Sequence, residues 1–309
     1  MGGLQLLLYF AVLFFVVAIV AKTIKIARMP IHLRWDLYPV PHEKGRGAYG
    51  GSYFEEIDWW TKPKNFSYLS EVKEMGKEIL FIQSLFHHNR PLWLFSFPFH
   101  FGMYCLIAHG VLLLTGSIII LGGIEISWLS KNIIPAAVFH LTLISGKAGW
   151  LLSAFGAFGL LMSRLFNGKL RSSAVLSDYV NLLILLALFT VGVVSSFTVD
   201  ISYSIQRAFI ADFITVKSAP ALPGILTAQL WILTILLIYF PFTHMTHFVG
   251  KYFTYHKIRW EDEPNVAGGK IEKAVSAALG YRINWSASHI KSGATWAEAA
   301  TEETTEREK

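Results

Sequence analysis

Long apolar segments, separated by stretches of charged and polar residues, set the pattern of this chain. Five segments reach the length of about 20 residues that a helix needs to cross the ~30 Å hydrocarbon core of a bilayer. They occupy residues 4–26, 92–121, 134–165, 175–199 and 225–249. The pattern therefore predicts an all-α integral membrane protein with a bundle of five transmembrane helices.

The first apolar segment differs from a secretory signal peptide. It has no basic residue ahead of it, it is long for such a region, and Lys22, Lys25 and Arg28 follow it. We therefore expect it to remain in the protein as a spanning helix.

Lysine and arginine are distributed unevenly between the two sides of this topology. They are concentrated in residues 22–90 and 164–171, whereas the alternate connections carry only Lys131, Arg207 and Lys217. Because basic residues favour the inner side of a membrane, we expect a multi-pass protein of the cytoplasmic (inner) membrane. Its N-terminus lies outside, and a long loop and the C-terminal tail are cytoplasmic. The formal charge of +6 comes mostly from the lysine and arginine residues that mark the inner side of the membrane. We therefore expect no nucleic-acid partner.

Composition supports the membrane class and restricts the cofactors. Apolar residues make up 53% of the chain, aromatic residues 15%, and the mean hydropathy is +0.46. The single cysteine, Cys105, excludes a disulfide framework and covalent haem attachment of the usual c type. Iron–sulfur clusters need about four thiolates, so this chain cannot ligate one by itself.

Two histidines in the second apolar segment are the strongest chemical signal. His100 and His109 lie within a bilayer-length stretch, where an imidazole is costly to bury and is functional by default. Neutral imidazole is a good axial ligand for haem iron, and a histidine from a facing helix completes a low-spin site. His244 and His247, near the end of the last apolar segment, supply that facing partner. We expect the two stretches to bind haem b.

Two motifs carry a resemblance to a known family. Phe240-Pro241-Phe242 followed by His247, together with a His-x-Gly at His100 and a His-Gly at His109, resembles the gamma (cytochrome b) subunit of respiratory nitrate reductase. The tail, with Trp-Ser-Ala-x-His-Ile and then Thr-Trp-Ala-Glu within residues 285–298, resembles that subunit's relatives in sulfate-reducing organisms. Those relatives are membrane cytochromes b that pair with a heterodisulfide-reductase-like iron–sulfur protein.

The resemblance implies a function and a ligand pair. His100 and His247 are the expected axial ligands of the haem nearer the inside, with His244 as the runner-up. The subunit would exchange electrons between menaquinone and a cytoplasmic iron–sulfur partner, as the quinone-reactive part of a multi-subunit quinone oxidoreductase. Lipid and other subunits of the complex would surround it.

A second haem follows the family pattern less closely. The family spaces the two histidines of the second helix by ten residues, and its fifth helix has another histidine eighteen residues before the last; here the spacing is nine and Gln229 stands at that position. We expect a second haem b held by His109 and His140, with one haem as the alternative. Lys147 is the candidate contact for a haem propionate or a quinone oxygen, unless its stem lets the ammonium group reach water.

These expectations divide the chain into four parts. Residues 1–28 form the first spanning helix, 29–91 a cytoplasmic loop with an amphipathic helix, 92–250 a four-helix haem-binding membrane core, and 251–309 a cytoplasmic tail for partner docking. Apolar residues from Leu69 to Phe86 recur at three- and four-residue steps, which predicts a helix at the inner interface or a docking surface. The aromatic residues Tyr281, Trp285 and Trp296 are expected to bury against another chain.

Two functions of other classes stay open. The histidines could hydrogen-bond between helices in a non-redox membrane anchor subunit of a respiratory complex. Alternatively, His140 and Lys147 could line the proton path of a transporter. No pair of Gly/Pro-interrupted helices related by an internal repeat is evident, which disfavours the transporter.

Overall fold

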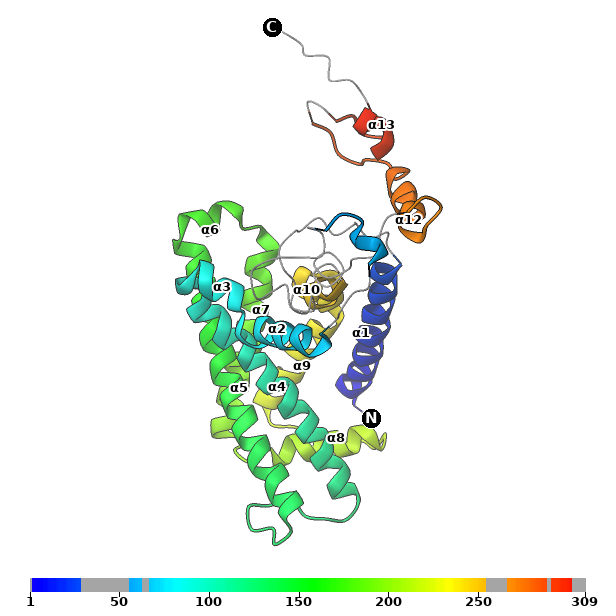
Figure 1. Ribbon diagram of the computed structural model, residues 1–309. Coiled ribbons are helices and arrows are strands. Elements are labelled where there is room, and N and C mark those ends of the chain that lie inside the picture. The colour runs from blue at the N-terminus through cyan, green and yellow to red at the C-terminus, as the bar shows by residue number, and fades with distance from the viewer. Residues whose placement is uncertain (1, 29–55, 63–66, 254–265, 288–289, 302–309) are drawn as a thin grey trace. The chain divides into compact units, whose positions relative to one another are not determined.

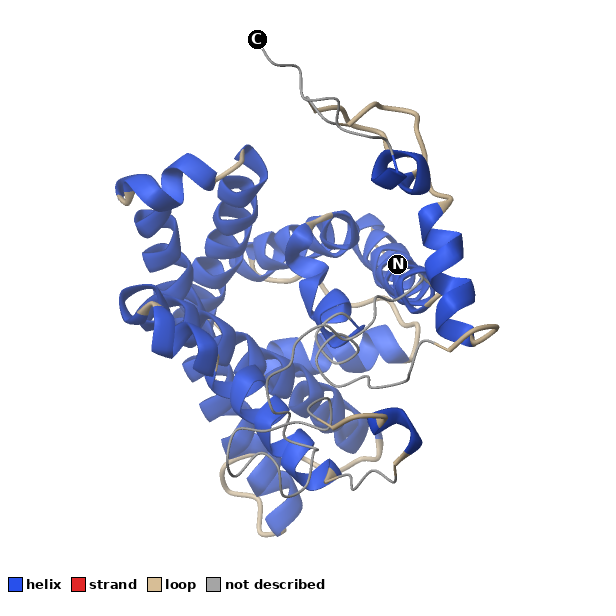
Figure 2. Ribbon diagram, turned by 45° about the horizontal axis from the view of Figure 1, so that its top comes forward, coloured by secondary structure: helices blue, strands red, loops and turns tan. Residues whose placement is uncertain are grey.

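The computed structural model describes residues 2–28, 56–62, 67–253, 266–287 and 290–301. Within these ranges the chain is helical, and its only β-type pairs are two isolated bridges in the tail (Figure 2). The longer helices are α1 (Gly3–Ala27), α2 (Tyr68–Phe81), α4 (Arg90–Leu121), α5 (Ile133–Phe166), α7 (Leu176–Thr198), α8 (Ser204–Ile214), α9 (Gly224–Tyr239) and α12 (Lys270–Leu279). Shorter ones are η2 (Trp59–Thr61), α3 (Gln83–His88), α6 (Gly168–Ser173), η3 (Phe240–Phe242), η4 (His244–Thr246), α10 (His247–Lys251) and α13 (Trp296–Thr301).

Five of these helices are long and apolar enough to cross a membrane. They are Gly3–Ala27, Arg90–Leu121, Ile133–Phe166, Leu176–Thr198 and Gly224–Phe242. The prediction of an all-α, multi-pass membrane protein is therefore confirmed, and the first four segments match their expected positions within two residues.

The fifth apolar segment does not continue as one helix to residue 249. Helix α9 ends at Tyr239, and two short 3-10 turns separate it from α10. Pro241 explains the break, since proline has no N–H to donate and its ring would clash with the carbonyl four residues earlier in a continuing α-helix. The carbonyl of Phe240 instead accepts hydrogen bonds from the N–H and the hydroxyl of Thr243, at 3.1 and 2.9 Å. His244 and His247 thus follow a break in the backbone.

The described residues fall into two compact units. The first unit comprises Met1–Ala18 and Glu74–Thr243, and the second comprises Ile19–Lys73 and His244–Lys309. Residues 29–55 and 63–66 of the predicted loop, and the segment 254–265, lie outside the described residues.

Helices α4 and α5 form the closest pair of the first unit (Figure 1). Three glycines of α5, at positions 149, 156 and 159, let the backbones approach each other. A Cβ on Gly156 would stand 2.6 Å from the Phe95 carbonyl oxygen and closer still to the Phe99 amide nitrogen. Small residues allow such contacts in membrane helices, where van der Waals packing replaces the hydrophobic effect as the driving force. The α4–α5 pair is thus fixed along its length by glycine positions.

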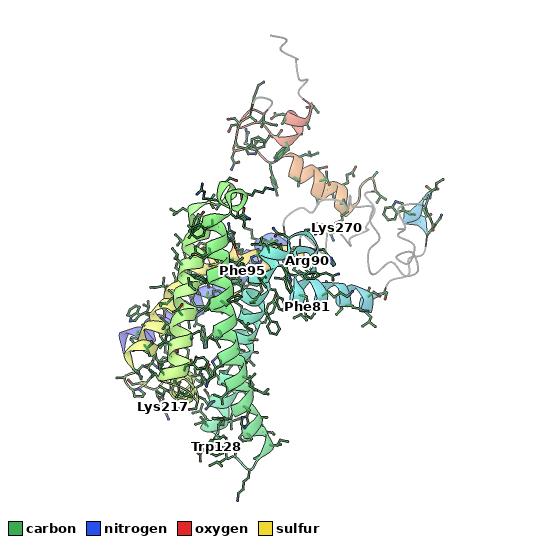
Figure 3. All side chains as sticks on the ribbon, turned by 90° about the vertical axis from the view of Figure 1, so that its left-hand side faces the viewer. Phe81, Arg90, Phe95, Trp128, Lys217 and Lys270 are labelled. Atoms are coloured by element: carbon green, nitrogen blue, oxygen red, sulfur yellow. The ribbon has the colours of Figure 1, made fainter. Side chains whose placement is uncertain are left out.

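The predicted amphipathic helix is present as α2, and its C-terminal end packs on α4. The Trp93 indole N–H donates to the Phe81 carbonyl at 2.7 Å, and the Tyr104 hydroxyl donates to the Ile79 carbonyl at 2.8 Å. The Phe97 ring stacks on both Trp93 and Phe81. Figures 1 and 3 show this part of α2 running across α4, as a helix lying in a membrane interface does.

An ion pair joins α5 to the start of α7. The Arg164 guanidinium lies 3.0 Å from the Asp178 carboxylate, which also accepts the N–H of Val175 at 3.2 Å. Acidic side chains in the first turn of a helix stabilise its unpaired amides. Asp178 therefore stabilises the start of α7.

Asp178→Asn is expected to lower the stability of the α5–α7 contact by about 1 kcal/mol, because the amide loses both the ion pair and the charge at the helix start. Thermal unfolding of the purified protein in detergent measures this loss. Arg171→Gln is the control, since Arg171 is exposed on α6. Equal melting temperatures for the two variants would contradict the assignment.

The tail of the second unit contains a small loop closed by backbone pairing. The Ile283 N–H donates to the Ala294 carbonyl at 2.8 Å, and the Trp296 N–H donates to the Tyr281 carbonyl at 3.1 Å. Trp285 and Trp296 meet edge to face with ring centroids 6.3 Å apart, and both stay more than 40% exposed. Partly exposed tryptophans on an ordered loop are typical of a surface that another chain covers.

Candidate functional site

His100 lies on α4 with one imidazole nitrogen fixed by its own helix. The Nδ1–H donates to the Ser96 carbonyl at 2.7 Å, which leaves the lone pair on Nε2. The ring is half-buried and meets the Phe99 ring edge to face at 5.1 Å. A hydrogen bond from the second nitrogen to a carbonyl is the arrangement that orients a metal-binding histidine and sets its tautomer.

His247 has the same arrangement at the start of α10. Its Nδ1–H donates to the His244 carbonyl at 3.2 Å, and its ring is exposed. His244 is exposed as well, in the turn that precedes α10. His100 belongs to the first unit and His247 to the second, so the pairing of these two imidazoles stays a prediction.

The tautomer arrangement alone does not mark a ligand. His88, on α3 outside the candidate spans, also donates Nδ1–H to a carbonyl, that of Ser84 at 2.7 Å. What distinguishes His100 is its position within a spanning helix. His88 therefore serves as a matched control for any ligand experiment.

His109 has a different environment in the other half of α4. It is 3% exposed, and its Nδ1–H donates to the Thr142 carbonyl of α5 at 3.1 Å. The Tyr203 ring stands edge-on to the imidazole, with centroids 4.3 Å apart. The Nε2 atom is buried without a hydrogen-bond partner among the described residues.

His140 and Lys147 do not join His109. His140 is exposed and lies two residues from Thr142, so at 100° per residue it lies on the opposite side of α5 from the His109 contact. The Lys147 ammonium group lies over the Phe197 ring, 5.1 Å from its centroid. The predicted His109–His140 ligand pair finds no support in this arrangement, and Lys147 has a cation–π contact as its partner.

His109 belongs to a group of four residues with buried polar atoms. His109 Nε2, Trp150 Nε1, the Tyr203 hydroxyl and Arg207 Nε are each without a hydrogen-bond partner in the described part of the chain. We call these four residues the His109 centre. They come from α4, α5, the α7–α8 turn and α8. Such orphaned groups are rare in folded proteins, and each is costly.

The α7–α8 turn places Tyr203 and Arg207 in the interior. The Asp200 carboxylate accepts the N–H groups of Ile205 and Gln206 at 3.1 and 2.9 Å, which caps the first turn of α8. Tyr203 has a left-handed backbone with φ of 57° and is fully buried. Burial raises the pKa of Tyr203 to about 12, against the opposing effects of the nearby Ser196 and Trp150.

Arg207 is the second buried group of this turn. It is 1% exposed and lies against Gly116 of α4, where a Cβ would stand 2.8 Å from Arg207 Nε. Burial lowers the pKa of Arg207, and the charge of Asp200 opposes that effect. Sequence reasoning assigned Arg207 to an outer loop. Asp200 and Ser204, which suit the start of a helix, were the signal that could have predicted α8 around Arg207.

Comparisons with protein-family models, with curated proteins and with solved structures find no match. The function is therefore argued from the residues themselves.

Haem fits the two ends of α4 differently. At His100 the donor chemistry fits, because the fixed tautomer presents Nε2 as a ligand. At His109 the nitrogen is suitable but the space is filled by protein. A Cβ on Gly146 would stand 2.5 Å from the Tyr203 hydroxyl oxygen and 2.7 Å from His109 Cε1, so the two rings and α5 already touch. A macrocycle does not fit at His109.

Proposed function

We propose that this chain is a membrane cytochrome b subunit that transfers electrons between menaquinone and a cytoplasmic iron–sulfur partner. The observation that supports the proposal is the fixed tautomer of His100 within a spanning helix, with Nδ1–H held by the Ser96 carbonyl. His247, after the break at Pro241, has the same tautomer. The two would be the axial ligands of a haem b.

The residues of the chain have defined tasks in this function. Ser96 and the His244 carbonyl orient the two imidazoles, so that each presents Nε2 rather than Nδ1. A haem held by these two histidines would supply a reversible one-electron couple. The surrounding apolar side chains, such as Phe99, which is 8% exposed, exclude water and thereby influence the redox potential.

The distribution of basic residues supports an orientation for this exchange. Basic residues next to the spans favour an N-terminus outside and a C-terminus in the cytoplasm. The iron–sulfur partner would then dock on the inner loop and on the tail, where Tyr281, Trp285 and Trp296 stay exposed. Aromatic side chains of this kind are the common anchors of protein interfaces.

A reduced-minus-oxidised absorption spectrum of the purified chain tests the proposal. We expect a b-type band, and we expect menaquinol added to the oxidised protein to produce the same band. Absence of haem after expression in a haem-replete host would contradict the cytochrome function. It would leave the alternative of a non-redox membrane anchor.

A further inference from the structure

We infer that the chain binds one haem, at His100, and that Tyr203 fills the space beside His109 where a second haem would lie. This inference rests on the proposed cytochrome function and fixes its cofactor content. It assigns His109 to the contact between helices rather than to iron.

The first argument is steric. The Tyr203 ring lies against the His109 imidazole, and both rings reach the surface of α5 at Gly146. On the neighbouring side, the Trp150 ring lies against α7 where Gly192 has no side chain, because a Cβ there would overlap the indole. Two glycines thus make room for two large aromatic residues. A site shaped for a macrocycle would instead keep that volume open.

The second argument concerns the second axial ligand. Between Gly102 and Thr243, all of which the structure describes, the only histidines are His109 and His140. His140 is exposed and lies across α5 from the Thr142 carbonyl that binds His109. Gln229 accepts a hydrogen bond from the Ser195 hydroxyl at 2.8 Å and is 8% exposed. Neither His140 nor Gln229 is therefore placed to complete a pair with His109.

The third argument is that the backbone holds Tyr203 in place. A left-handed conformation at a tyrosine is disfavoured and persists only where its surroundings impose it. Here the Tyr203 N–H donates to the Asp200 carbonyl at 3.0 Å, while the Asp200 side chain caps α8. The turn thus keeps the ring against His109. The Tyr203 hydroxyl lies beside the His109 ring at Gly146, so the volume next to the imidazole belongs to protein.

Haem counting decides between one and two sites. Haem per chain is measured as the pyridine haemochrome of the purified protein against protein by amino-acid analysis. We expect one haem per chain and a single one-electron component in a potentiometric titration. Two haems per chain would overturn the inference and leave the proposed function intact, whereas no haem would refute the proposed function itself.

Two variants then locate that haem. His100→Gln is expected to remove it completely, while His109→Gln and the control His88→Gln keep it in full. Haem that persists in His100→Gln would place the site at His109 and overturn the inference. The haem content of His100→Gln is a valid test even if His109→Gln fails to accumulate, because the two variants are measured separately.

Discussion

Gly156→Ala should destabilise the protein by about 3 kcal/mol, and Gly156→Leu should prevent it from accumulating in the membrane. The reason is that the new Cβ would meet the Phe99 amide nitrogen and the Phe95 carbonyl oxygen, which are backbone atoms of α4. A flexible side chain could move away, but a helix backbone can only shift as a whole. Overpacking of a close contact costs about 1–3 kcal/mol, and more when nothing can relax.

Thermal unfolding in detergent, followed by size-exclusion chromatography of the heated protein, measures the effect. Gly110→Ala is the matched control on the same helix pair, because a Cβ at Gly110 meets nothing within 4 Å. We expect this variant to stay within about 0.5 kcal/mol of the parent protein. If Gly156→Ala and Gly110→Ala unfold at the same temperature, α4 and α5 do not approach each other as closely at Gly156 as described here.

His247→Ala is expected to abolish haem binding while the five spanning helices still insert. His247 lies beyond the last candidate span, which ends at Phe242, so its loss leaves the apolar segments unchanged. His247 would be one of the two residues that hold the haem, and its removal is expected to lower haem occupancy to near zero. The measurement is haem content per chain in the membrane-extracted protein.

His244→Ala is the control for this prediction. His244 is the runner-up ligand, stands three residues earlier and is equally exposed. We expect it to keep full haem content, since its carbonyl, which the substitution retains, is what orients His247. If His247→Ala keeps its full haem content and His244→Ala loses it, then His244 is the ligand and His247 is not.

The spans could be predicted from the sequence because their cause is local. A run of about 20 apolar residues has no stable alternative to a spanning helix in a bilayer. The end of the fifth helix was predicted wrongly because hydropathy continues through Pro241, whereas backbone hydrogen bonding does not. Weighing the proline above the hydropathy would have ended the helix at Tyr239.

The surroundings of His109 could not be predicted in the same way. Nine residues at 100° each place His109 on the opposite side of α4 from His100, and sequence reasoning expected His140 as its partner at a second haem. The contacts of His109 in the structure are the backbone of Thr142 and the ring of Tyr203. Every residue type has a backbone carbonyl, so the sequence does not reveal which one accepts a hydrogen bond from His109. The path of the α7–α8 turn depends on packing between distant segments.

The length of α4 and α5 has a mechanical consequence. They contain 32 and 34 residues, and a helix rises 1.5 Å per residue, so each exceeds a ~30 Å hydrocarbon core by about 18 Å or more. Near the end of the pair that carries Arg90 and Arg164, the Phe95 ring of α4 packs directly on Gly159 of α5. The excess length requires the pair to tilt in the bilayer or to extend beyond the hydrocarbon core, and the glycine contacts make the two helices do so together.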